Sequence, residues 1–163
     1  MADEVFWDTS GFFALLNTDD PQHGDAVGLA HLLAVEPRGS VTTDAVVGEC
    51  CTLLVARRKP HLVTTFLDFS EQSSALEVVH LDVALVAATK EFLRKHLDHE
   101  YSFVDCASFV VMARRGLREA RRLTNISRRP GSSSSSARLG DGGDAHPPMA
   151  LISIFGSRGG LAA

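Results

Sequence analysis

Short apolar runs alternate with longer amphipathic segments along the first two thirds of the chain. Residues 5–7, 39–43 and 75–81 are the short runs, and their length and composition predict strands. Apolar residues with helical spacing follow each run, further helices are predicted from about residues 21 and 60, and residues 117–123 are a candidate fourth strand. Strands that alternate with helices predict a parallel sheet covered on both faces, a three-layer α/β/α fold.

Capping residues mark the ends of several predicted helices. Asp20 is placed to cap a helix with Pro21 at its first position, and Asp82 is placed to cap a later one. Ser102 opens the last helix, and Gly116 is placed to end it. These signals indicate where the chain leaves each strand, and open parallel sheets bind ligands at that carboxyl edge.

The regular pattern ends near residue 124. Residues 125–163 are rich in Ser, Gly and Arg, so we predict one domain over residues 1–124 and a disordered tail over 125–163. Charge divides the chain in a similar way, because residues 1–113 hold 17 Asp and Glu against 7 Lys and Arg, whereas residues 114–163 hold 3 against 9. A formal net charge of −4 argues against a general nucleic-acid coat protein.

Cysteine use and hydropathy favour a cytoplasmic protein. Cys50, Cys51 and Cys106 show no C-x-x-C spacing, and we predict buried thiols in a reducing compartment. No apolar run approaches the roughly 18 residues that a membrane-spanning helix needs, and the acidic start does not resemble a secretory signal. We therefore expect a soluble protein without a membrane partner.

Carboxylates occupy similar places in three strand and helix units. Asp8 directly follows the first strand, Glu49 lies on the helix after the second, and Asp105 lies in the first turn of the last helix. Each has a structural alternative: a helix cap for Asp8, a solvated face for Glu49 and a capping box with Ser102 for Asp105. If they converge, they offer the oxygen ligands that Mg²⁺ or Mn²⁺ prefers, and such a metal activates water against a phosphodiester.

The stretches around these acids resemble motifs of the PIN domain family, in particular its VapC-type toxin ribonucleases. They read VFWDTS from Val5, VVGECCTLL from Val46 and YSFVDCASF from Tyr101, and the likeness extends over roughly residues 5–120. The resemblance implies a parallel sheet of four to five strands, Mg²⁺ or Mn²⁺ as cofactor, RNA as substrate and a cognate antitoxin as partner, and it allows a homodimer. Asp8, Glu49 and Asp105 match the first three acids of the family.

Two further residues are candidates for supporting roles. Ser10 matches a hydroxyl that in the family often supports the first Asp, and Asp98 stands where relatives often carry an acid. A solvated loop position is the alternative for Asp98. His96 and His99 flank it, but His-x-x-His without a third ligand is more typical of a solvated surface than of a metal site.

The chain departs from the family after about Ala120. PIN domains usually carry a fourth acid after the strand that follows the Asp105 helix, whereas residues 123–127 here read LTNIS. If the codon of Leu123 ends in G, a shifted reading frame yields Asp from Leu-Thr and permits x-His-Phe-Ala-Ala-Ala-Gly-Phe through Ser132, which is the missing family ending. We therefore hypothesise that the tail is out of frame.

Three functions are compatible with these observations. The leading one is a metal-dependent endoribonuclease, the toxin of a toxin–antitoxin pair, with Asp8, Glu49 and Asp105 as metal ligands and catalytic residues. The alternative is a catalytically impaired PIN remnant that only binds an antitoxin or RNA, because the fourth acid and the fifth strand are missing. A phosphatase with Asp8 as nucleophile is disfavoured, because such enzymes carry a second Asp two residues after the first, and this chain has Ser10 at that position.

Overall fold

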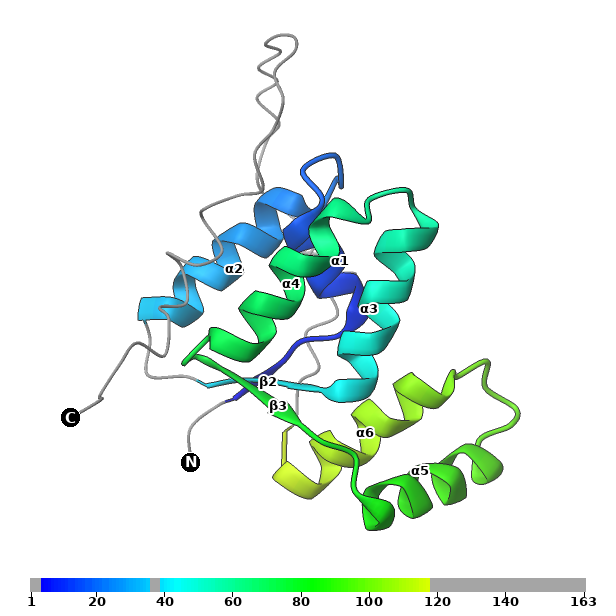
Figure 1. Ribbon diagram of the computed structural model, residues 1–163. Helices are drawn as coiled ribbons and strands as arrows, with labels where there is room; N and C mark the ends of the chain where they lie inside the picture. Colours follow the sequence, from blue (N-terminus) through cyan, green and yellow to red (C-terminus); the bar gives the residue numbers. More distant parts are fainter. Residues whose placement is uncertain (1–3, 36–38, 118–163) are drawn as a thin grey trace, which may run out of the picture.

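The computed structural model describes residues 4–35 and 39–117, and over these ranges it contains three strands and six helices (Figure 1). The strands are β1 (Val5–Phe6), β2 (Ser40–Thr43) and β3 (Leu76–Val79), which pair in parallel in that order. The helices are α1 (Thr9–Leu16), α2 (His23–Val35), α3 (Asp44–Ala56), α4 (His61–Gln72), α5 (Val83–Lys95) and α6 (Phe103–Arg115). Strands and helices alternate as the sequence pattern predicts.

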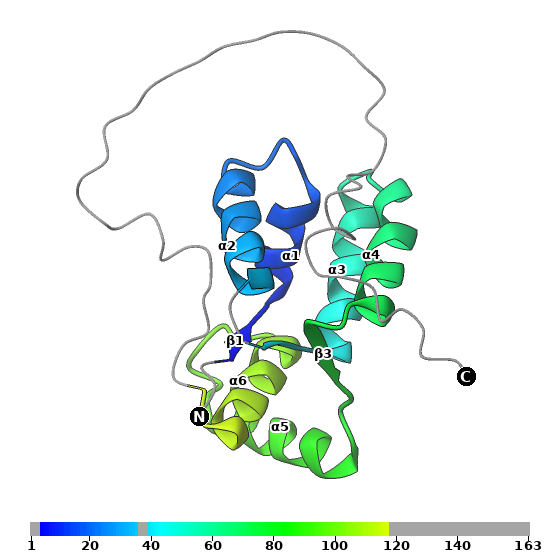
Figure 2. The same cartoon turned by 90° about the vertical axis from the view of Figure 1, so that its left-hand side faces the viewer.

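The sheet lies between two helical layers. Helices α1 to α4 cover one face and α5 and α6 cover the other, as two perpendicular views show (Figures 1 and 2). This arrangement confirms the three-layer α/β/α architecture. Of the four to five strands expected, three lie within the described residues. The candidate strand over residues 117–123, apart from Leu117, and the tail predicted over residues 125–163 lie outside them.

Packing around the end of β1 holds the chain rigidly just before Asp8. The ring of Trp7 stacks on Phe12 with centroids 5.5 Å apart, and Phe12 in turn contacts Phe66 at 5.0 Å. Trp7 Nε1 donates a hydrogen bond to Ser40 Oγ at 3.3 Å, and Thr42 Oγ1 donates to the Trp7 carbonyl at 2.8 Å. Because these side chains are buried and closely packed, they fix the direction in which the chain passes from β1 into α1.

The predicted boundaries of α5 and α6 are confirmed. The Asp82 carboxylate accepts the Leu85 N–H at 2.7 Å as the N-cap of α5, and Ser102 caps α6. Gly116 ends α6 with φ +67°, a left-handed conformation that glycine adopts without steric cost. Among the described helices, none combines the length and the apolar character needed to cross a membrane.

The start of α2 differs from the prediction. The Asp20 carbonyl accepts the His23 N–H at 2.9 Å, and the Asp20 carboxylate accepts the Gln22 N–H at 2.8 Å. These two bonds close a tight turn through Pro21, and the helix begins only at His23. Asp-Pro is suited both to a turn and to a helix start, and here the chain uses it for the turn.

The thiols are free, and two of the three are buried. Cys50 and Cys106 are buried as predicted, whereas Cys51 is half-buried. Burial, with smaller contributions from the neighbouring Cys51 and Glu49, raises the pKa of Cys50 to about 12. The Cys50 side chain therefore stays a neutral thiol at physiological pH and is a poor nucleophile.

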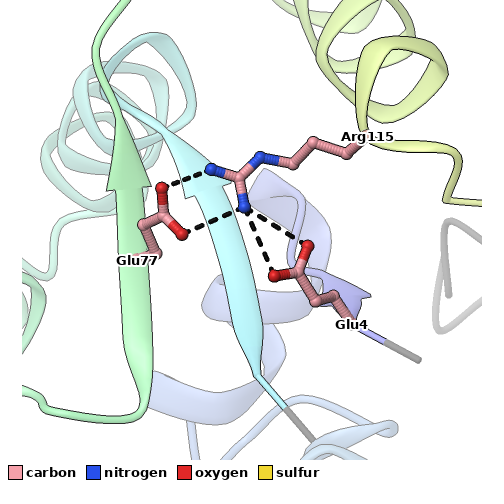
Figure 3. A network of polar contacts seen from close by, with 3 residues as sticks. All are labelled: Glu4, Glu77 and Arg115. Carbon is pink, nitrogen blue, oxygen red and sulfur yellow. Dashed lines mark hydrogen bonds and ion pairs between the residues drawn. The ribbon is translucent and has the colours of Figure 1, made fainter. Parts of the chain in front are cut away.

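The guanidinium group of Arg115 ties the end of α6 to the two outer strands of the three-stranded sheet that the structure describes. Arg115 donates to Glu77 on β3, with one bond of 3.0 Å from Nη1, and to Glu4 just before β1 at 3.2 Å (Figure 3). The Arg115 side chain is 28% exposed. The hydrogen bonds that Arg115 donates to Glu77 and, to a smaller extent, to Glu4 hold the pKa of Arg115 above its usual value. This clamp fixes the helix that carries Asp105 against the sheet.

Candidate active site

Asp8 stands between the end of β1 and the first turn of α1. Its Oδ1 accepts hydrogen bonds from the Gly11 N–H and from Ser10 Oγ, both at 2.8 Å. A Cβ at Gly11 would lie 3.2 Å from the Trp7 ring and 3.4 Å from Asp8 Oδ1, so glycine permits the close approach. Asp8 is therefore a helix N-cap. A carboxylate that caps a helix can also bind a metal, so a role as ligand is compatible with the cap.

Glu49 lies on α3 and is bonded to α1 across the structure. Thr9 Oγ1 donates a short hydrogen bond to Glu49 Oε2, although the two residues are 40 positions apart. The Glu49 side chain is half-buried, so the structure disfavours the solvated-face alternative. Thr9 was not among the predicted site residues. Its hydroxyl next to Asp8 is visible in the sequence, but its partner on another helix is not.

Asp105 lies in the first turn of α6 and forms the predicted capping box. Its Oδ2 accepts bonds from the Ser102 N–H and from Ser102 Oγ, each at 2.9 Å. The Asp105 N–H in turn donates to Ser102 Oγ at 3.1 Å. The capping alternative is therefore confirmed for Asp105, and the box fixes the orientation of its carboxylate at the positive end of the helix dipole.

A single cavity of about 350 Å³ brings the three acids together. Asp8, Glu49 and Asp105 all line it, as do the hydroxyl residues Thr9, Ser10 and Ser108. Val46, Leu53 and Val104 supply an apolar part of the wall. In the part of the chain that the structure describes, no Lys, Arg or His lines this cavity. The described part of the cavity wall is therefore acidic, and Asp8 and Asp105 lie at the positive, amino-terminal ends of α1 and α6.

Of the two predicted supporting residues, one lines the cavity and the other does not. Ser10 lies in the cavity wall and donates to Asp8, as expected of a supporting hydroxyl. Asp98 does not line the cavity, and its side chain is 77% exposed in the connection between α5 and α6. Its carboxylate lies 3.6 Å from His99 Nε2. The structure therefore favours the solvated-loop alternative for Asp98.

The donor atoms of the cavity suit a hard divalent cation. They are carboxylate and hydroxyl oxygens, without thiol or imidazole, which is the ligand set of Mg²⁺ or Mn²⁺. Within residues 4–35 and 39–117, no three acidic, His or Cys side chains gather closely enough to form a compact metal cluster. The carboxylates are spread around the cavity, and they fit such an ion by donor chemistry and charge.

Comparisons with known proteins identify the family of this chain. Residues 5–125 match the PIN domain family. The 23S rRNA-specific endonuclease VapC20 of Mycobacterium tuberculosis is 37% identical over 116 residues, which cover 71% of this chain and 86% of that protein. The crystal structure of M. tuberculosis VapC20, described as a sarcin-ricin loop cleaving toxin, matches with a TM-score of 0.64 and 32% identity, covering 76% of this chain and 95% of that one. The chain therefore belongs to the PIN domain family.

Proposed function

We propose that this chain is a metal-dependent endoribonuclease, the toxin component of a toxin–antitoxin pair, which hydrolyses RNA phosphodiester bonds. The observation that carries the proposal is the convergence of Asp8, Glu49 and Asp105 on one cavity. Asp8 caps α1, Glu49 lies on α3 and Asp105 lies on α6, and the three match the acids of the family motif. A relative named as a 23S rRNA-specific endonuclease supports RNA, and ribosomal RNA in particular, as the substrate.

In this proposal, Asp8, Glu49 and Asp105 hold Mg²⁺ or Mn²⁺, which when bound polarises a phosphoryl oxygen and promotes deprotonation of water. The chain itself supplies orientation. Ser10 and the Gly11 N–H aim the Asp8 carboxylate, and Thr9 aims Glu49. Such second contacts limit the rotation of each acid, and their loss typically weakens metal affinity or activity by about 10- to 100-fold.

The apolar wall has a complementary role. Val46, Leu53 and Val104 face the same cavity as the acids. Apolar side chains lower the local dielectric constant and leave less room for bulk water, which strengthens the attraction between carboxylates and a cation. They also give a ribose or base a surface to contact beside the phosphodiester. The cavity thus combines charge for a metal with apolar area for a nucleotide.

RNA cleavage by the purified full-length chain tests the proposal. Ribosomal RNA is incubated with the protein in Mn²⁺, in Mg²⁺ and in excess EDTA, and the Asp8→Asn variant is the matched control. We expect discrete cleavage products with either metal and none with EDTA or with the variant. Undiminished cleavage in excess EDTA would contradict the metal dependence.

A catalytically impaired remnant is the second candidate, and one observation favours it. The stretch after Leu123 lacks the fourth acid that the family usually carries there. Calorimetric titration with Mn²⁺ separates the two candidates, because an enzyme binds the metal detectably and an impaired remnant does not. The same titration of a frame-corrected chain shows whether restoring the acid restores metal binding.

The partners remain part of the proposal. We propose a cognate antitoxin protein as binding partner and allow for a homodimer. We also propose that the protein acts in the cytoplasm, because the proposed substrate is ribosomal RNA. Light scattering after size-exclusion chromatography distinguishes a monomer from a dimer. Co-expression with the product of the neighbouring gene tests for the antitoxin, which should co-purify and suppress RNA cleavage.

A further inference from the structure

Three hydroxyl side chains of the described residues line the cavity, and one of them differs from the other two in its partner. The hydroxyls of Thr9 and Ser10 each donate a hydrogen bond to an acid of the site. Ser108 instead donates to the main-chain carbonyl of Val104, one turn earlier on α6, at 2.8 Å. The orientation of the acids therefore accounts for two of the hydroxyls and leaves the third without a role.

The bond to Val104 determines what Ser108 can offer to a ligand. A hydroxyl has one proton to donate and two lone pairs that accept. Because the proton of Ser108 is directed at its own helix, its Oγ offers lone pairs to a molecule in the cavity. Ser108 is only 7% exposed, so a ligand that fills the cavity leaves this oxygen little access to water. The ligand should therefore carry a hydrogen-bond donor at this place.

Ser108 is a neighbour of Asp105 in the cavity wall. The two residues are three positions apart on α6, so their side chains lie on one helix face with Cβ atoms about 5–6 Å apart. In RNA, the 2′-hydroxyl stands on the ribose carbon next to the one that carries the 3′-phosphate. A phosphodiester beside Asp105 therefore brings a 2′-hydroxyl, which is a hydrogen-bond donor, within reach of Ser108.

The cavity wall around Ser108 suits the rest of the sugar. Val104 and Leu53 line the cavity as well, Val104 from α6 and Leu53 from α3, and both are half-buried. The two helices are in contact with each other. The C–H groups of a ribose are apolar, so contact with these aliphatic side chains removes apolar surface from water. The wall thus presents an acid, a hydrogen-bond acceptor and apolar area side by side, as a ribose with its 3′-phosphate requires.

We infer that Ser108 Oγ accepts a hydrogen bond from the ribose 2′-hydroxyl at the cleaved phosphodiester and so makes the site prefer RNA to DNA. This inference rests on the proposed function, because it places a phosphodiester at the three acids. The 2′-hydroxyl is the group by which a protein distinguishes RNA from DNA at a given site. DNA fills the cavity without supplying a donor and leaves the buried acceptor unpaired, which costs affinity.

Fluorescence anisotropy with the full-length chain tests the inference by binding alone. The probes are three labelled single strands with the same bases: RNA, DNA with deoxyuridine, and 2′-fluoro RNA, whose sugar resembles ribose in shape but has no 2′ donor. Ca²⁺ replaces the proposed cofactor, because it also takes carboxylate ligands, and a gel of each sample reads the intact probe.

We expect the wild-type chain to bind RNA about 2- to 10-fold more tightly than either other strand, the range for one hydrogen bond. Ser108→Ala should bind all three strands equally. Ser70→Ala is the matched control: Ser70 on α4 is also buried and donates to a helix carbonyl, that of Leu67, at 2.8 Å, but it does not line the cavity. This control should keep the wild-type preference.

Three results would overturn the inference. They are equal wild-type affinity for the three strands, a preference for RNA that Ser108→Ala retains, and equal weakening of RNA and DNA in Ser108→Ala, which would assign the hydroxyl to a contact that both share. The comparison of strands on the wild-type chain does not depend on the folding of a variant, and thermal melts check the variants.

Cleavage in Mn²⁺ separates this inference from the proposed function. If the chain prefers RNA through Ser108 but cleaves none, the proposed catalysis fails and the ribose contact stands. If the chain cleaves RNA and binds the three strands equally, the ribose contact alone fails.

Discussion

Replacing Asp8 separates its role in the fold from a role in chemistry. In the structure, Asp8 Oδ1 accepts two hydrogen bonds of 2.8 Å, from Gly11 and Ser10. Asp8→Asn keeps an oxygen at this position, and Asn caps helices about as well as Asp, so the free energy of unfolding should change by less than about 0.5 kcal/mol. The variant removes the negative charge, and RNA cleavage should fall by more than about 100-fold.

Asp8→Ala is the companion variant and removes the charge and the cap together. Loss of an N-cap costs about 0.5–2 kcal/mol, and the buried Gly11 N–H is then left without its acceptor. For a domain of this size, a loss of that order lowers the thermal midpoint by roughly 2–8 °C. Activity should be as low as in Asp8→Asn, so the two variants differ in stability alone.

Circular-dichroism melts and metal-dependent RNA cleavage, measured on the same preparations, distinguish a role of Asp8 in the fold from a role in the reaction. If Asp8→Asn loses its melting transition together with its activity, the carboxylate acts through the helix cap, and its assignment as a metal ligand loses its support. If Asp8→Asn is folded and cleaves RNA at the wild-type rate, the negative charge at this position has no part in the reaction, which refutes the reasoning directly.

Four further outcomes are expected. Excess EDTA should abolish RNA cleavage by the frame-corrected chain and Mn²⁺ should restore it, since the cavity offers only hard oxygen ligands. The chain as written should have a lower thermal midpoint and less cleavage than the frame-corrected form; equal values would mean that the tail after Leu123 is native, and resequencing the gene checks this directly. Arg115→Met should reduce the free energy of unfolding in urea by about 1 kcal/mol, whereas the exposed neighbour Arg114 replaced by Met should have no effect. Burial raises the pKa of Cys50 from 9.0 to about 12, so its contribution to stability is complete below pH 9 and is lost as the pH rises toward 12. In Cys50→Ala, the free energy of unfolding in urea should therefore depend less on pH across this range.

Local structure follows from short-range signals and was therefore predictable. The caps of α5 and α6 and the glycine at the end of α6 depend on side chains that bond to backbone groups within three or four residues. The start of α2 was predicted two residues too early, because Asp20 and Pro21 suit a turn as well as a helix start. Only the bonds that the surrounding chain permits decide between the two.

The candidate site, too, was predictable in part: its acids could be named from the sequence, but their tertiary contacts could not. Asp8, Glu49 and Asp105 were predictable as candidates, since Asp8 follows a strand, Glu49 lies on the helix after a strand and Asp105 lies in the first turn of a helix. The bond from Thr9 to Glu49 joins positions 40 residues apart, and the exposure of Asp98 depends on the path of a loop. Neither is encoded in spacing along one element.

The amino-acid sequence by itself determined the alternation of strands and helices, the family resemblance and the acids worth examining, because hydrophobic period, caps and motifs act over a few residues. Only the tertiary structure decided that three acids share one cavity and that Arg115 joins β3 to the chain before β1. The reason is physical: these contacts join segments that are distant along the chain, and they exist only once packing of the whole core has placed those segments together.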